Sequence, residues 1–330
     1  MPTSGVRGNH SRHMSDQAER TERSEQHLAS MASLESRFQA QGEHRHGSFR
    51  GLSRSGFHEV AYTEWGDPAS SRVVICLHGL SRQGRDFDPL ASVLAADGYR
   101  VLCPDLVGRG RSGWLRDPEE YALPQYCMDM AVLIARTGAE QVDWIGTSLG
   151  ALVGMVLAGQ PDSPIRRLIV NDIGPYLPWA ALWRIGNAIR SSPRDFADLN
   201  AAEAYHRMAL APFGDLSDAE WRHLTAHGVE RRADGRYHFL YDPAIVRAFR
   251  AGLLYNLSLW RYWDAIRCPV LLLRGEYSDL LLESTAEEMA RRGPRAELVE
   301  IPGCGHAPAL LDPDQIALIT EWMAQTTDAA

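Results

Sequence analysis

The chain lacks three features that would each point to a particular class of protein. No apolar run reaches the roughly 18 residues that a membrane-spanning helix needs. Its five cysteines have no CxxC spacing, which argues against a disulfide framework or a zinc site and favours reduced thiols. It has no excess of positive charge, and its net charge of -8 argues against nucleic acid or acidic membranes as partners. We therefore expect a cytoplasmic globular protein.

Residues 1–46 differ in composition from the rest of the 330-residue chain. They hold six arginines, six acidic residues and five of the twelve histidines, but few large apolar side chains. They contain no apolar core of a signal peptide, and such a composition cannot bury enough surface to fold. We predict a disordered tail, with one short helix around residues 28–38 as the alternative. The histidines are irregularly spaced, so we predict no metal site.

From about residue 57 onward, strand patterns alternate with helical patterns. Short apolar runs such as RVVICLHG are typical of strands buried on both faces of a sheet, and segments with apolar residues at helical spacing follow them. This alternation predicts an α/β fold with a mostly parallel central sheet flanked by helices, formed by residues 47–174 and 266–330. Residues 175–265 show amphipathic helices and no convincing strand. We predict that they form a helical cap at the carboxyl edge of the sheet, where ligands bind in such folds.

Ser148 lies between a predicted strand and a predicted helix, in the sequence Gly146-Thr-Ser-Leu-Gly150. A serine hydroxyl becomes a nucleophile only when a base removes its proton. A G-x-S-x-G turn between strand and helix holds the serine oxygen above the sheet and directs the next backbone N–H toward a developing oxyanion. A glycine-rich packing turn with an incidental serine is the alternative, but the flanking strand and helix favour a nucleophile.

A serine nucleophile needs a histidine, and that histidine needs an acid. His306 lies in a glycine-flanked loop after the last predicted strand, and Asp279 lies in a loop after the strand before it. The order Ser, Asp, His is the one that this architecture uses. Asp279 could instead cap the following helix, and Asp172, at the end of the strand after Ser148, is the competing acid. We predict a catalytic triad of Ser148, His306 and Asp279.

Five segments together resemble the α/β-hydrolase superfamily, and the resemblance covers residues 57–327 apart from the cap. They are HGL at 78–80, DLVGRGRS at 105–112, GTSLG at 146–150, GEYSD at 275–279 and GCGHAP at 303–308. The resemblance implies that Leu80 and Leu149 supply the backbone N–H groups of an oxyanion hole. It also implies that His78 holds its loop by hydrogen bonds and is not a second base.

A competing motif has to be weighed, because Gly108–Gly113 fits the dinucleotide-binding pattern G-x-G-x-x-G. The sequence that follows, WLRDPEE, is not a helix, so a pyrophosphate would have no helix N-terminus to bind. Arginines also occupy two positions where the backbone should approach phosphate. We therefore predict no nucleotide and no other cofactor.

The serine nucleophile and the resemblance predict a serine esterase or lactonase that works through an acyl-enzyme intermediate on a small-molecule ester. A C–C bond hydrolase of the meta-cleavage type is the alternative, although such enzymes usually show Gly-Asn-Ser-Met-Gly at the nucleophile. A non-catalytic binding protein is a further alternative, which the complete triad disfavours. A homodimer is left open.

Four residues could contact the substrate. Arg82 and Arg85 follow the oxyanion residue Leu80 and could bind a substrate carboxylate, or form ion pairs with Asp86 or Asp88. Trp179 and Trp183 share one face of the first cap helix, which could pack on the sheet domain or line the pocket. We expect an apolar cleft in either case.

Overall fold

The computed structural model describes residues 43–249 and 256–325. The predicted tail therefore lies almost entirely outside the described residues. Its last residues belong to a strand, because β1 spans His44–Ser53 and pairs antiparallel with β2, Gly56–Trp65. The predicted boundary at residue 46 is too late at this point.

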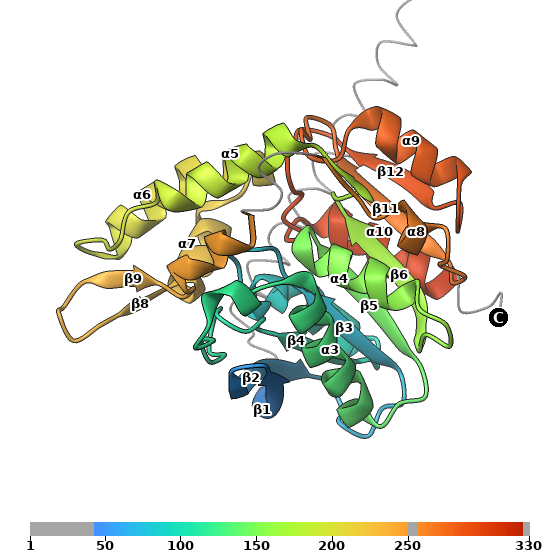
Figure 1. The fold of residues 1–330 in the computed structure, drawn as a ribbon, viewed down its shortest axis with the longest axis horizontal. Helices are drawn as coiled ribbons and strands as arrows, with labels where there is room; N and C mark the ends of the chain where they lie inside the picture. The colour runs from blue at the N-terminus through green and yellow to red at the C-terminus, as the bar shows by residue number, and fades with distance from the viewer. Residues whose placement is uncertain (1–42, 250–255, 326–330) are drawn as a thin grey trace, which may run out of the picture. The chain divides into compact units, whose positions relative to one another are not determined.

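The core is one eight-stranded sheet in the order β1-β2-β4-β3-β5-β6-β11-β12 (Figure 1). The pairs from β4 to β12 are parallel, and only β1 and β2 run antiparallel to their neighbours. All five residues of β3 are buried, as expected for a parallel strand covered on both faces. The remaining strands are β3 (Val73–Leu77), β4 (Arg100–Pro104), β5 (Val142–Thr147), β6 (Ile165–Asn171), β11 (Val270–Gly275) and β12 (Glu297–Ile301).

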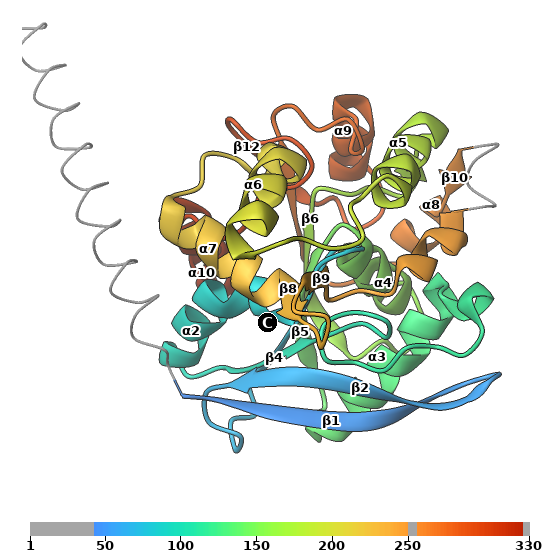
Figure 2. The same ribbon diagram turned by 90° about the vertical axis from the view of Figure 1, so that its left-hand side faces the viewer.

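Helices cover both faces of this sheet (Figure 2). Helices α3, α4 and α8 lie on one face, and α2 and α10 lie on the other, while α9 packs beside β12. The predicted α/β fold with a mostly parallel sheet is confirmed. The helices are α2 (Asp88–Ala96), α3 (Leu123–Thr137), α4 (Leu149–Ala158), α8 (Trp260–Trp263), α9 (Glu283–Arg291) and α10 (Pro313–Gln325), with 3₁₀ turns η1 (Gly84–Phe87) and η2 (Pro118–Glu120).

Between β6 and β11 the chain leaves the sheet and forms the segment that the sequence predicts as a cap. This segment has a small aromatic cluster of its own, formed by Phe196, Tyr205 of α6 and Phe239 of β9. It also contains two short antiparallel pairs, β7–β10 and β8–β9, which the sequence does not predict. Its elements are β7 (Tyr176–Leu177), α5 (Trp179–Arg190), α6 (Leu199–Ala209), η3 (Ala211–Phe213), α7 (Asp218–Gly228), β8 (Val229–Arg231), β9 (Tyr237–Phe239), η4 (Pro243–Phe249) and β10 (Leu257–Ser258).

None of the helices in the described ranges combines the length and the apolar character that crossing a membrane requires.

Candidate active site

Ser148 forms the turn between β5 and α4. Its backbone has φ 52° and ψ -115°, a region that residues with a side chain seldom adopt and that is associated with functional sites. Glycines flank it because the strand and helix pass so closely: a methyl group at Gly146 would collide with the backbone of Ala151, and one at Gly150 with the carbonyl of Leu77. The Ser148 hydroxyl therefore projects from the carboxyl edge of the sheet.

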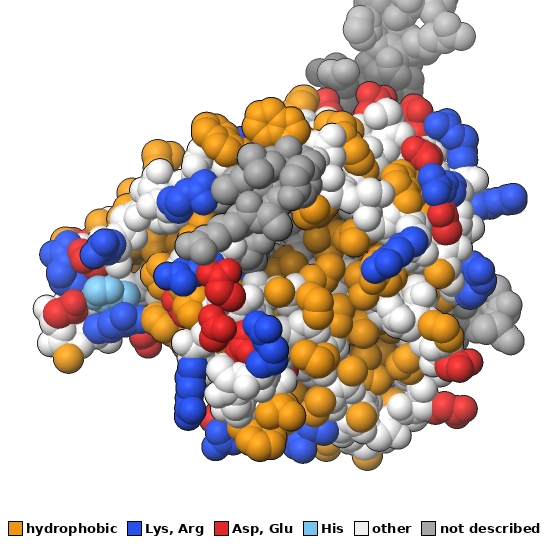
Figure 3. Space-filling model, in the orientation of Figure 1, with side chains coloured by type: hydrophobic (Ala, Val, Ile, Leu, Met, Phe, Trp, Pro, Cys, Tyr) orange, Lys and Arg blue, Asp and Glu red, His pale blue; other side chains and the backbone are white. Residues whose placement is uncertain are grey.

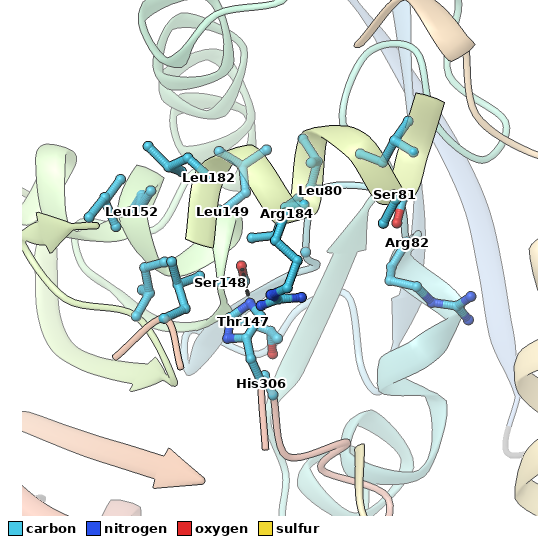
Figure 4. Close-up of a pocket in the computed structure, with 18 of the residues that line it drawn as sticks. Leu80, Ser81, Arg82, Thr147, Ser148, Leu149, Leu152, Leu182, Arg184 and His306 are labelled. Atoms are coloured by element: carbon cyan, nitrogen blue, oxygen red, sulfur yellow. Dashed lines mark hydrogen bonds between the residues drawn. The ribbon is translucent and has the colours of Figure 1, made fainter. Parts of the chain in front are cut away.

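The structure brings His306 to Ser148 and a buried carboxylate to His306. The distance from Ser148 Oγ to His306 Nε2 is 2.9 Å (Figure 4), and His306 Nδ1 lies 2.8 Å from Asp172 Oδ2. Asp172 directly follows β6 and has no exposed surface. If Nδ1–H donates to Asp172, Nε2 carries a lone pair toward the serine hydroxyl, which is the tautomer a general base needs.

The Asp172 carboxylate is held by two further donors. The backbone N–H of Gly275 donates to Oδ1 at 2.9 Å, and the hydroxyl of Ser278 donates to Oδ2 at 2.7 Å. Both donors belong to the end of β11 and the loop after it. These contacts fix the position of the carboxylate and compensate for its removal from water.

The prediction of Asp279 as the third member of the triad is wrong. The loop after β11 points the Ser278 hydroxyl inward, so the next side chain points outward, and Asp279 is about half exposed. Its carboxylate accepts a hydrogen bond of 2.6 Å from Arg184 on α5. Asp172, which the sequence offered as the competing acid, occupies the position beside His306. Both aspartates satisfy the order Ser, Asp, His, so chain order alone could not separate them.

Leu80 and Leu149, the residues predicted to supply an oxyanion hole, lie at the same cavity as Ser148. The N–H of Leu149 belongs to the first residue of α4, where an N–H has no partner within the helix. Leu80 follows Gly79, whose Cα carries no side chain and lies next to Ser148. The structure thus places both residues close to Ser148, where the predicted oxyanion hole would have to be.

His78 orients the peptide that carries the Leu80 N–H. Its Nδ1 donates to the Gly79 carbonyl at 2.6 Å, and its Nε2 accepts from the N–H of Leu106 at 2.9 Å. Complete burial lowers the pKa of His78 to about 3, so the ring is neutral and can accept at Nε2. In a trans peptide the N–H points opposite to the carbonyl, so the Leu80 N–H faces away from His78. His78 has the structural function that the resemblance implies.

A cavity of about 470 Å³ opens above Ser148 between the sheet edge and the cap. Its walls are mainly apolar. From α5 come Leu182, Ile185 and Ile189, and from the core come Leu80, Leu149 and Leu152. Its volume is in the usual range for small-molecule sites. His206 also lines it, and burial lowers the pKa of this histidine to about 3, so it adds no charge at neutral pH.

A family model described as "Alpha/beta hydrolase family" matches residues 74–317. The chain belongs to the alpha/beta hydrolase family. A curated relative, the 3-hydroxybutyrate-oligomer hydrolase of Cupriavidus necator, is 47% identical over 279 residues, which are 82% of this chain and 94% of the relative. A solved alpha/beta hydrolase from Novosphingobium aromaticivorans is 36% identical with a TM-score of 0.75, covering 85% of this chain and 98% of that chain. A putative hydrolase from Rickettsia typhi is 31% identical with a TM-score of 0.78, covering 86% and 99%.

This alpha/beta hydrolase acts on carboxylic esters, and the predicted class of enzyme is confirmed.

Of the four residues predicted to contact the substrate, the structure places only Arg82 at the cavity. Arg82 is buried and binds Asp86 through two hydrogen bonds of 2.7 and 2.8 Å; Arg85 pairs with Asp88 instead of facing the cavity. Both arginines thus form the ion pairs that the sequence offered as the alternative.

Trp179 and Trp183 neither line the cavity nor pack on the sheet. Their exposed fractions are 50% and 51%, and the cavity-facing side of α5 carries Leu182 and Ile185. Hydrophobic side chains gather along the outer side of α5 (Figure 3). The prediction of these tryptophans as substrate-binding residues is wrong, because the helix is rotated so that the residues next to them face inward.

The loop Gly108–Gly113 contacts the backbone of Leu80, and its own N–H groups already have partners, so they cannot bind a pyrophosphate. Its backbone N–H groups are used within the protein; Gly108 donates to Gly113 and Gly110 donates to Leu240. Arg109 is fully buried, and its Nε donates to the carbonyl of Leu80 at 2.8 Å. The sequence did not indicate this contact of Arg109.

One group of potential metal ligands lies outside the cavity, where α7 meets α2. One ligand atom from each of Asp88, His223 and His227 lies within 4.8 Å of the others. Arg85 already forms an ion pair of 2.6 Å with Asp88, and His223 Nε2 donates to the Arg85 carbonyl at 2.8 Å. A cation would have to displace Arg85, so the group serves as a contact between cap and core in the arrangement observed.

Proposed function

We propose that this alpha/beta hydrolase cleaves short linear esters of 3-hydroxybutyrate through an acyl-enzyme on Ser148, with His306 as general base and Asp172 as the acid that orients it. The observation that carries the mechanism is the pair of hydrogen bonds linking Ser148 to His306 and His306 to Asp172. The substrate is inferred from the relative of 47% identity, a 3-hydroxybutyrate-oligomer hydrolase.

In the first half of the reaction, His306 Nε2 takes the proton of the Ser148 hydroxyl while Oγ attacks the ester carbonyl. The carbonyl electrons move onto oxygen, and the N–H groups of Leu80 and Leu149 stabilise this oxyanion. Collapse of the intermediate breaks the bond to the ester oxygen. The proton on Nε2 passes to that oxygen, which leaves as the hydroxyl group of the shorter product.

In the second half, His306 removes a proton from a water molecule that attacks the acyl-Ser148 carbonyl. The same two N–H groups stabilise the second oxyanion, and the proton returns to Ser148 Oγ as the acid leaves. Asp172 remains ionised and stabilises the imidazolium that forms twice in each cycle. The mechanism consumes one water for each ester cleaved.

The shape and polarity of the cavity support a short aliphatic ester. Its apolar walls suit methyl and methylene groups, and its volume of about 470 Å³ suits a ligand larger than a simple acetyl ester. The five free cysteines support the inference of a reducing, cytoplasmic setting. A homodimer stays a prediction, which light scattering on the purified protein would test.

The test is hydrolysis of the dimer and trimer of 3-hydroxybutyrate, with p-nitrophenyl butyrate and a six-membered lactone for comparison. We expect the highest kcat/KM on the oligomers and a loss of about 10⁵- to 10⁶-fold in kcat for Ser148→Ala. Ser163→Ala, which alters a serine that does not line the cavity, serves as the matched control.

Turnover of the nitrophenyl ester without any release of 3-hydroxybutyrate from the oligomers would reject the proposed substrate and keep the mechanism. Ser148→Ala activity near that of Ser163→Ala would reject the mechanism. Preferred cleavage of a dienone C–C bond would favour the alternative reaction that the sequence left open.

A further inference from the structure

Arg184 is a cation that lines the cavity above Ser148. It is paired with Asp279, which takes no part in the proposed chemistry. It lies on α5 and lines the cavity, and its side chain points from the helix toward Ser148 and His306 (Figure 4). Its guanidinium donates to Asp279 at 2.6 Å, and the two side chains are 49% and 54% exposed. Asp279 itself is not in contact with His306.

The other arginine that lines the cavity, Arg82, already has hydrogen-bond partners within the protein. Arg82 binds Asp86 through two nitrogens and donates to the carbonyl of Leu224 at 3.2 Å. Its side chain is 9% exposed. His206 is uncharged at neutral pH because burial lowers its pKa to about 3. Among the described residues that line the cavity, Arg184 is therefore the cation that a substrate can reach.

The bond between Arg184 and Asp279 is of a kind that exchanges readily. It is a single contact between half-exposed groups, and such surface pairs contribute little to stability. A guanidinium can instead bind a ligand carboxylate through two parallel N–H donors, which is the stronger arrangement. An incoming carboxylate could thus replace Asp279 without leaving any buried charge unpaired.

We propose that Arg184 binds the terminal carboxylate of the substrate and that Asp279 is the counter-ion which this carboxylate displaces. This inference rests on the proposed function, because a linear oligomer of a hydroxy acid ends in one free carboxylate. That carboxylate belongs to the leaving group of the last ester bond. Binding it on α5 sets the distance from the acid end to Ser148, so cleavage is directed to bonds near that end.

The experiment compares two forms of the 3-hydroxybutyrate dimer, the free acid and the terminal primary amide. The amide has the same ester bond and no charge. We expect Arg184→Gln to raise KM for the acid by about tenfold to a hundredfold, the usual loss of a charge-assisted hydrogen bond, and to change KM for the amide less than about threefold. Arg190→Gln, an exposed arginine of the same helix that does not line the cavity, is the matched control.

Asp279→Asn should change KM for the acid in the opposite direction. Removing the competing carboxylate should lower KM for the acid several-fold while the amide responds less, and the change should vanish when Arg184→Gln is already present. A rise in KM for the acid in Asp279→Asn, or equal responses of acid and amide to Arg184→Gln, would overturn the proposal.

A second measurement keeps the subsite testable if the oligomers prove not to be substrates. Hydrolysis of p-nitrophenyl butyrate is followed in the presence of 3-hydroxybutyrate or its amide as inhibitor. The proposal requires that the anion inhibit the wild-type protein more strongly than the amide does, and that Arg184→Gln remove the difference. Equal inhibition of both proteins by the anion would reject a carboxylate site at Arg184, whatever the natural ester is.

Discussion

The segments that follow β6 and β11 leave neighbouring strands of one sheet, and each carries an aspartate. Asp172, after β6, is fully buried and accepts hydrogen bonds from Gly275, Ser278 and His306. Asp279, after β11, is about half exposed and has one contact, to Arg184. Several buried donors hold a carboxylate in one orientation, whereas an exposed pair can exchange partners. The first segment is suited to chemistry and the second to recognition.

The largest expected effect separates these two aspartates. Asp172→Asn should lower kcat on p-nitrophenyl butyrate by about 10⁴-fold, because the amide can no longer hold His306 in the required tautomer and orientation. Asp279→Asn should retain more than about a tenth of kcat on this uncharged ester, because its carboxylate does not contact His306. Steady-state kinetics on both variants, with thermal melting to verify folding, measures the difference. The reverse order of losses would make Asp279 the acid after all.

A smaller loss of kcat is expected for Arg109, a buried residue that would act on the reaction only through the backbone that it holds. Arg109 holds the carbonyl of Leu80 and also donates to the carbonyl of Val107 and the hydroxyl of Tyr126. Arg109→Met should lower kcat by roughly tenfold to a hundredfold with little change in KM, because a displaced oxyanion donor is lost in part.

The control for Arg109→Met is the fraction of molecules that a phosphonate labels on Ser148, which reports how much of the variant is folded. If kcat per labelled site equals the wild-type value, Arg109 contributes to folding alone. Arg109→Lys should recover little, because a single ammonium cannot reproduce the three directed contacts.

The smallest effect compares a buried histidine of the cap with one of the core. Burial lowers the pKa of both His206 and His78 from 6.5 to about 3. Between these values the unfolded chain binds a proton that the folded chain does not, so the free energy of unfolding decreases as the pH falls below 6.5. For each histidine, the slope of the free energy of unfolding against pH is at most ~1.4 kcal/mol per pH unit.

His206→Gln should remove the contribution of His206 to this slope and leave those of His78 and of His227, a second cap histidine whose pKa burial also lowers to about 3. Urea unfolding at pH 7.0 and 5.5 would measure it, with His238→Gln in the β8–β9 hairpin as the control. An unchanged slope in His206→Gln would mean that the cap unfolds before the core and that its histidine does not report on the main transition.

The sequence predicted the elements that have strong local signals. The flanking glycines of Ser148 and the loop of His306 were sufficient to identify two residues that the structure joins by a hydrogen bond of 2.9 Å. β1 was missed because Phe49 is its only large buried apolar residue, and its stability comes from pairing with β2. Such pairing is a long-range property that no short window of sequence contains.

The choice of acid and the rotation of α5 also depended on long-range packing. Asp172 and Asp279 both follow strands, and only the inward position of Ser278 shows which carboxylate faces His306. Trp179 and Trp183 share one face of α5, and nothing in the neighbouring sequence indicates which face of this helix points inward. In the structure both large apolar side chains are about half exposed. Size and hydrophobicity favour burial on average but do not determine it for a given residue.

The loop after β3 has a consequence for protein engineering. Leu80 carries the N–H that we propose as an oxyanion donor. Only two residues later Arg82 donates to the Leu224 carbonyl on α7, and His223 of α7 donates to the Arg85 carbonyl. The attachment of the cap and the proposed oxyanion donor thus share one short stretch of backbone. A cap grafted from another enzyme would have to bring a matching loop with it, and directed evolution of substrate range through α7 would be coupled to turnover.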